Sequence, residues 1–180
     1  SDLGDLTKVN KWLQRSHVFD GLLLATTLGH TTVMKHLLSL TILSLDQQRT
    51  LTTQAAVHQQ WRHLRYFLEN LGLQCDFGSR SSDPLIWASM HGAPLEVYLL
   101  LIFYSDNINT TDSNGRTPAI ITSVYKHRQH FWLLLQHGAN MNYMSRHGES
   151  CITHVLANNW MSIVQEMRSE EHTSELQSPD

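Results

Sequence analysis

The sequence predicts an all-α protein, built as a solenoid of stacked helix–turn–helix repeats. One stretch, residues 112–144, carries a complete set of start and stop signals for two short helices. Similar signals return before and after this stretch at a spacing of roughly 33 residues, a period typical of stacked helical repeats. Because each repeat buries its apolar side only against its neighbours, such a fold needs several repeats in a row.

The stretch 112–144 defines the repeat. Thr117 can cap a helix that begins at Pro118, where the fixed φ angle of proline suits the first turn and its missing N–H is not needed. Lys126 and His127 end this short helix. A second helix carries a run of leucines and ends near Gly138, a residue suited to the left-handed conformation found at helix ends. We therefore expect two helices joined by a tight turn.

The same stretch resembles an ankyrin repeat in the order of its residues and in its period. The residues that carry the resemblance are Gly115, Thr117-Pro118, the run Leu133–Leu135 and the segment Gly138–Asn142. The resemblance extends over nearly the whole chain before residue 168 and is strongest over residues 78–167. It implies an ankyrin-type helix–turn–helix repeat solenoid with a right-angled, L-shaped profile.

We expect about five repeats within a domain of residues 1–167. Their approximate ranges are 17–43, 50–77, 78–111, 112–144 and 145–167. Ahead of them, residues 3–15 resemble the second helix of a partial repeat that would bury Trp12 and Leu13. The first and last repeats are expected to be incomplete, as if the chain were part of a longer polypeptide. Uncovered apolar side chains at these ends predict self-association through them.

The first two repeats depart most from the pattern. The turn Gly29-His30 fits the repeat 17–43, but the stretch after it has no glycine and offers Ser44 with Gln47 as a helix-capping box in place of a hairpin. In the repeat 50–77, Gln59-Gln60 replaces the Gly-His turn.

The later repeats follow the pattern more closely. Asp83-Pro84 predicts a helix start in the repeat 78–111, and Gly92 predicts its end. In the repeat 145–167, Gly148 and Cys151 lie at the expected spacing, with Cys151 in the position of the proline.

The end of the chain predicts a foreign segment. Residues 168–178 resemble the in-frame translation of a widely used DNA-sequencing adapter, so residues 168–180 are interpreted as a non-native tail. The formal charge of the whole chain is −3, but without the tail twelve acidic and twelve basic residues remain. A neutral domain without a basic stripe gives no reason to expect nucleic acid as a partner.

The apolar segments and the cysteines indicate in which cellular compartment we expect the protein. No apolar run approaches the roughly 20 residues that cross a bilayer, so we expect no membrane insertion. Cys75 and Cys151 form neither a disulfide framework nor a zinc-spaced cluster, which favours buried free thiols. Together these features predict a cytoplasmic or otherwise intracellular protein.

Catalytic and metal-binding motifs are not found. Twelve histidines raise the question of a metal, but His127, His130 and His137 are spread over different parts of one repeat. The close pair Cys151 and His154 falls at a helix start, and neither a nucleophile elbow nor a glycine-rich phosphate loop occurs. Five tryptophans could form stacking platforms, although their places beside leucines favour packing. We expect no metal, no cofactor and no catalysis.

The resemblance implies a protein–protein interaction module that binds another protein on its concave face. Ankyrin repeats usually contact partners through their hairpin tips and through the exposed end of each first helix. The matching residues are Arg80, Ser82, Asn114, Arg116, Arg146, His147 and Glu149 at the tips, and Met90, His91, Val124, Tyr125 and Asn158 at the helix ends. An apolar centre with an arginine rim is typical of interaction hot spots. The alternative is the targeting arm of a larger multidomain enzyme whose catalytic domain lies outside this fragment.

Overall fold

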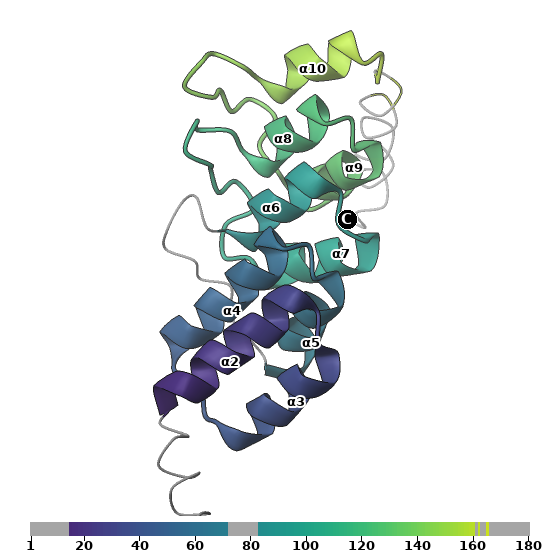
Figure 1. Cartoon of the computed structure of the whole chain (residues 1–180). Coiled ribbons are helices and arrows are strands. Elements are labelled where there is room, and N and C mark those ends of the chain that lie inside the picture. Colours follow the sequence, from purple (N-terminus) through teal and green to yellow (C-terminus); the bar gives the residue numbers. More distant parts are fainter. Residues whose placement is uncertain (1–14, 72–82, 161, 163–164, 166–180) are drawn as a thin grey trace, which may run out of the picture. The chain divides into compact units, whose positions relative to one another are not determined.

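The structure is a computed structural model that describes residues 15–71 and 83–160, together with residues 162 and 165. Within these residues it contains nine helices and no β-strand longer than an isolated bridge (Figure 1). The helices are α2 (Arg15–Leu28), α3 (Thr31–Leu40), α4 (Leu45–Val57), α5 (Trp61–Leu71), α6 (Pro84–His91), α7 (Leu95–Tyr104), α8 (Pro118–Val124), α9 (Arg128–Gln136) and α10 (Cys151–Ala157). The predicted all-α class is confirmed.

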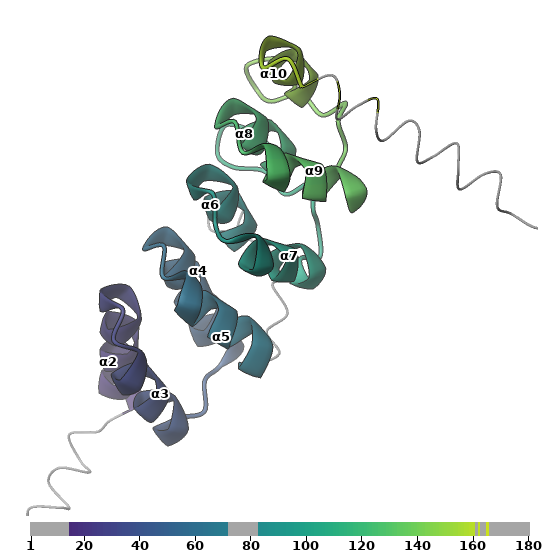
Figure 2. The same ribbon diagram turned by 90° about the vertical axis from the view of Figure 1, so that its right-hand side faces the viewer.

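The chain divides into two compact bodies, Ser1–Leu73 and Gln74–Asp180, which we call the N-terminal and C-terminal body. In the N-terminal body, α2 packs against α3 and α4, and α4 packs against α5 (Figure 2). Its core consists of side chains from all four helices, among them Leu22, Met34, Leu51, Leu64 and Phe67. Each helix pair thus buries apolar side chains against the next pair.

In the C-terminal body, the first helices of successive pairs lie in a row. Helix α8 packs against both α6 and α10, and the second helices α7 and α9 pack against each other (Figures 1 and 2). The largest buried side chains include Tyr98, Leu101, Ile120 and Phe131. The core of this body therefore runs through two layers of helices.

The start of α4 follows the predicted capping box. The Ser44 Oγ accepts a hydrogen bond from the backbone N–H of Gln47 at 3.3 Å, and the Ser44 N–H donates to the Gln47 side chain at 3.0 Å. These two bonds satisfy groups that a helix start otherwise leaves unpaired. Helix α4 begins at Leu45, five residues before the range predicted for this repeat.

Polar caps begin the three first helices of the C-terminal body. Asp83 accepts from the Leu85 N–H at 2.8 Å and Thr117 from the Ile120 N–H at 3.4 Å, and a proline follows each cap as predicted. Ser150 caps α10, whose first residue is the buried Cys151. Because each proline lacks an N–H that would need a partner, it fits the first helical position.

Several expectations fall outside the described residues. These are the partial repeat with Trp12 and Leu13, Cys75, Arg80, Ser82, and the tail 168–180. Among the helices that are described, none combines the length and the apolar composition that a membrane span requires.

Candidate protein-interaction surface

One tight turn ends every first helix, and these turns position several of the predicted contact residues. A residue with a left-handed backbone, with φ between 55 and 81°, stands at each turn: Gly29, Gln59, Gly92, Lys126 and Asn159. The N–H of the residue that follows donates to the carbonyl five residues earlier, at 2.8 to 3.2 Å in all five turns. This bond closes the helix end and directs the chain into the second helix.

Side chains at these turns bind the preceding repeat. The Gln60 side chain donates to the Thr27 carbonyl at 3.3 Å, and the Asn158 side chain donates to the Ser123 carbonyl at 2.9 Å. The His127 Nε2 lies 3.3 Å from the Met90 carbonyl. In each case the carbonyl belongs to the last turn of the preceding first helix, where no partner within the helix remains. The amide of Asn158, a predicted partner contact, is therefore used in packing between repeats.

Two buried histidines add a second set of such bonds. The His130 Nε2–H donates to the Ala93 carbonyl at 2.6 Å, and its ring meets the Tyr98 ring edge-on with centroids 4.6 Å apart. His63 lies between the Thr26 carbonyl, 3.3 Å from its Nδ1, and the Thr31 hydroxyl, 2.8 Å from its Nε2. Burial lowers the pKa of both histidines, because the charged ring would lose its hydration. Both rings therefore serve packing as neutral groups.

The two described hairpin tips share one backbone geometry. In the first tip, the Asp112 N–H donates to the Arg116 carbonyl at 3.0 Å; in the second, the Ser145 N–H donates to the Glu149 carbonyl at 2.8 Å. The Arg146 N–H also donates to the Asn114 carbonyl at 3.0 Å, so neighbouring tips are joined directly. Repetition of the tip after 33 residues agrees with the period of the sequence.

A buried carboxylate holds the first tip. Asp112 accepts from the backbone N–H groups of Asn114 and Arg116 at 2.9 and 2.8 Å. The second carboxylate oxygen of Asp112 accepts a hydrogen bond from the Arg116 Nε at 2.9 Å and forms an ion pair with the Arg116 Nη2 at 2.8 Å. Such a two-point pair fixes the guanidinium as well as the charge. The Arg116 side chain, a predicted contact residue, is thus committed to the hairpin.

Apart from Asn158, the predicted contact residues that the structure describes form two separate rows. The helix-end row contains Met90, His91, Val124 and Tyr125; the hairpin row contains Asn114, Arg116, Arg146, His147 and Glu149. The sequence predicted a single surface in which arginines flank Tyr125. In the structure, Arg116 precedes the start of α8 and Tyr125 follows its end, so roughly 10 Å of helix lies between them. The side chains from Pro118 to Ser123 are all buried, which separates the rows along α8.

The helix-end row is aromatic and partly exposed. His91 and Tyr125 are exposed, whereas Met90 and Val124 are half-buried. The His91 ring stacks on Trp87 with centroids 5.7 Å apart, and the Tyr125 ring stacks on His127 at 6.3 Å. Stacking limits the rotation of both exposed rings, so they are prepared for contact at a low entropic cost.

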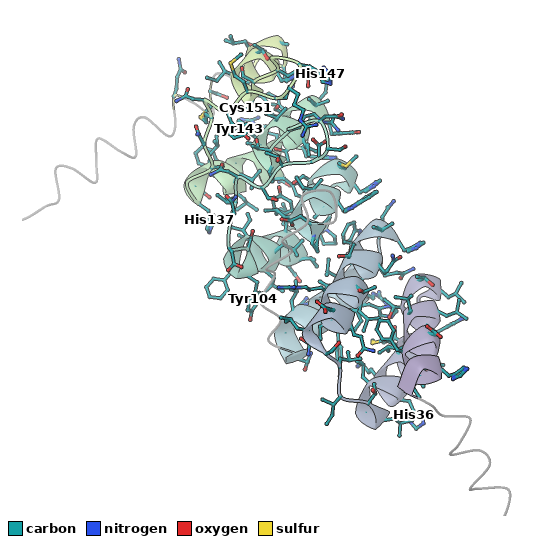
Figure 3. All side chains as sticks on the ribbon, turned by 90° about the vertical axis from the view of Figure 1, so that its left-hand side faces the viewer. His36, Tyr104, His137, Tyr143, His147 and Cys151 are labelled. Carbon is teal, nitrogen blue, oxygen red and sulfur yellow. The ribbon has the colours of Figure 1, made fainter. Side chains whose placement is uncertain are left out.

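Sequence reasoning missed two residues beside the second tip. Met144 is exposed and Tyr143 is also accessible, directly before Ser145 (Figure 3 labels Tyr143 and His147). Met144 pairs with Ser150 in an isolated antiparallel bridge, which holds the base of the hairpin. Tyr143 and Met144 therefore add apolar side chains to the tip that carries the positively charged Arg146. Their position immediately before the tip was the signal that could have identified them.

Other candidate chemistry is not assembled in the part of the chain that the structure describes. No group of three potential metal ligands occurs there. Cys151 is buried, donates to the Met141 carbonyl at 3.1 Å, and has its pKa raised by burial to about 11. Trp160 is half-buried, and its ring lies against the Phe131 ring with centroids 5.8 Å apart.

No protein-family model matches the chain, and no curated protein matches it in a sequence search.

Proposed function

We propose that the chain is an ankyrin-type repeat module that binds another protein and performs no catalysis itself. The repeated turn supports the ankyrin-type arrangement, since all five turns have a residue with a left-handed backbone at the same position and the same backbone hydrogen bond after it. From Gly92 onward they are 34 and 33 residues apart, which agrees with the ankyrin period of about 33. The row of first helices α6, α8 and α10 supports it as well.

One observation supports binding above the others: exposed aromatic and cationic side chains occupy a rigid frame in the C-terminal body. His91 and Tyr125 are stacked on neighbouring rings, and the hairpin tips are fixed by backbone bonds to each other. Tyrosine, methionine and arginine, all present on this frame, are enriched at the centres of protein interfaces. We assign the partner contact to the helix-end row and to the second tip with Tyr143, Met144, Arg146 and His147.

The proposed setting is intracellular. Cys151 is a free thiol enclosed in the C-terminal body, and its function there is packing rather than cross-linking. Proteins in reducing compartments commonly keep thiols in this state.

The test compares variants of the two rows after a partner has been isolated with the full chain as bait. Tyr125→Ala and Arg146→Ala should each weaken binding by about fivefold or more, which corresponds to roughly 1 kcal/mol. Phe103→Ala is the matched control, because Phe103 is 80% exposed on α7 and belongs to neither row. Titration calorimetry gives the affinities, and thermal melting checks that all variants fold. Unchanged affinity in both variants, or an equal loss in Phe103→Ala, would refute the assigned surface.

A further inference from the structure

The first hairpin tip contains the one asparagine of the sequence that a glycine follows, Asn114-Gly115. Asn114 is exposed, and Gly115 has a left-handed backbone with φ 74°. A Cβ added to Gly115 would lie 3.0 Å from the Arg146 Cγ and 3.2 Å from the Arg146 backbone nitrogen, closer than side chains normally approach. Both the backbone angle and the close approach of the second tip therefore favour a glycine directly after an exposed asparagine.

This dipeptide has a chemistry of its own. Asparagine is a thermolabile residue, and it reacts fastest before glycine, because no side chain shields the glycine nitrogen. The Gly115 nitrogen attacks the Asn114 Cγ; as this N–Cγ bond forms, the Cγ–Nδ2 bond breaks and ammonia leaves with the Gly115 proton. Water then opens the cyclic imide at one of its two carbonyl carbons. The products are aspartate and isoaspartate, in which the main chain runs through the former side chain.

Three hydrogen bonds of the closed tip oppose the first step. The Gly115 N–H, which carries the attacking nitrogen, donates to the Asp112 carbonyl at 3.0 Å. The Asn114 N–H donates to the Asp112 carboxylate at 2.9 Å, and the Asn114 carbonyl accepts from the Arg146 N–H at 3.0 Å. These bonds fix the peptide groups on both sides of Asn114. The attack therefore requires local opening of the tip.

We propose that Asn114 is a site of spontaneous deamidation, and that opening of the hairpin tip sets its rate. Either product adds a second carboxylate to a tip that already holds the Asp112 carboxylate, and like charges repel. Isoaspartate also lengthens the main chain of the tip, so the Arg146 N–H loses its acceptor. Modification thus uncouples this tip from the tip of the following repeat. The inference does not depend on the proposed partner surface.

The second tip offers a matched comparison within the same chain. Gly148 has the same φ of 74°, and its N–H donates to the Ser145 carbonyl at 3.0 Å. His147 precedes it in place of Asn114 and has no amide to lose. The Ser145 hydroxyl, which accepts at 3.3 and 3.1 Å, replaces the carboxylate of Asp112. Because charged acceptors form the stronger bonds, His147→Asn places an asparagine before glycine in a tip that opens more readily.

Peptide mapping by mass spectrometry, after timed incubation of the full chain at neutral pH, tests the proposal. Deamidation at residue 114 should be at least about tenfold slower in the folded parent than in concentrated guanidinium chloride, because only the open tip reacts. Asp112→Ala should raise the folded-state rate at least about fivefold, since it removes the carboxylate that holds the tip. Asn114→Gln is the control without deamidation at this position, because its longer side chain disfavours ring closure.

Two further measurements keep the test decisive if Asp112→Ala does not fold. In His147→Asn, residue 147 should deamidate faster than Asn114 of the same molecule. In the deamidated fraction of the parent, hydrogen exchange of the Arg146 amide should be faster than in the unmodified fraction. Equal rates in the folded and unfolded parent, or Asn114 reacting as fast as residue 147 of His147→Asn, would overturn control by the tip. Unchanged protection of Arg146 after deamidation would overturn the uncoupling of the tips.

Discussion

The two bodies use different connections to bring first helices together. In the N-terminal body, α2 and α4 have 14 and 13 residues, and a short extended link with the Ser44 capping box leads into α4. In the C-terminal body, α6, α8 and α10 have only 8, 7 and 7 residues, and the hairpin tips at Asp112 and Ser145 precede α8 and α10. In both bodies the first helix itself ends in the same left-handed turn. The turn is thus common to the two bodies, whereas the segment that leads into the first helix and the length of that helix differ between them.

The largest expected effect tests whether the two bodies are energetically separate. Phe67→Ala in α5 and Phe131→Ala in α9 each remove a fully buried ring, which should cost about 3–5 kcal/mol. Hydrogen exchange should show protection lost first in the body that carries the substitution. If either variant lowers protection equally throughout the described residues, the bodies unfold as one and the comparison fails.

Removing the hairpin carboxylate should destabilise only the C-terminal body. Asp112→Ala leaves two backbone N–H groups and the Arg116 guanidinium without their acceptor, at an expected cost of about 1–3 kcal/mol. Ser145→Ala is the matched change in the second tip and should cost about 1 kcal/mol, because the Ser145 Oγ accepts from two neutral N–H groups and its donation to the Glu149 carboxylate is long, at 3.5 Å. Urea unfolding measures both. Equal costs would show that the charge of Asp112 adds nothing.

Acid should weaken both bodies through their buried histidines. Burial lowers the pKa of His63 and of His130 in the folded chain, whereas a histidine in the unfolded chain keeps its usual pKa of about 6.5. As the pH falls through 6.5, these two side chains are therefore protonated first in the unfolded chain, which stabilises the unfolded state. Stability is then lost as the pH falls from that value through the lowered folded-state pKa. His130→Asn should reduce the pH slope of the unfolding free energy between pH 7 and about 5. A slope identical to that of the parent would contradict this cause.

The smallest expected effect is the change in stability when the left-handed residue of a turn is replaced. Gln59 and Lys126 hold left-handed conformations at φ 55 and 62°, where glycine avoids steric strain, so Gln59→Gly and Lys126→Gly should each raise stability by up to ~1 kcal/mol. Gly92→Ala is the reverse control, because its new Cβ would lie 2.8 Å from the His127 ring. Melting temperatures measure all three. Loss of stability in both glycine variants would mean that their side chains do more than occupy the turn.

Local signals made the C-terminal body the more predictable one. Caps followed by proline at Asp83 and Thr117, and Gly92 after α6, act within a few residues, and the structure has all of them. The lengths of α2 and α4 were not predicted from sequence. Neither has a proline at its first position, and packing against other helices decides how far such a helix extends.

The candidate surface was predictable in composition but not in arrangement. Residues at tips and helix ends were identified by their place in the repeat, and His91, Tyr125, Arg146 and His147 are indeed exposed. The roles of Arg116 and Asn158 depend on partners, Asp112 and the Ser123 carbonyl, whose side-chain and backbone geometry a residue pattern does not encode. Separation of the two rows follows from the burial of the intervening residues of α8.

The bonds from each turn to the preceding repeat also bear on how the chain folds as it is synthesised. Those of Gln60, Asn158 and His127 join residues 33, 35 and 37 positions apart. Contacts this local favour rapid folding. At roughly 5–20 residues per second, a ribosome supplies the next 37 residues in about 2–7 seconds. Each first helix therefore waits only seconds for the side chain that satisfies its last carbonyls, and the protein can mature stepwise from its N-terminus while translation continues.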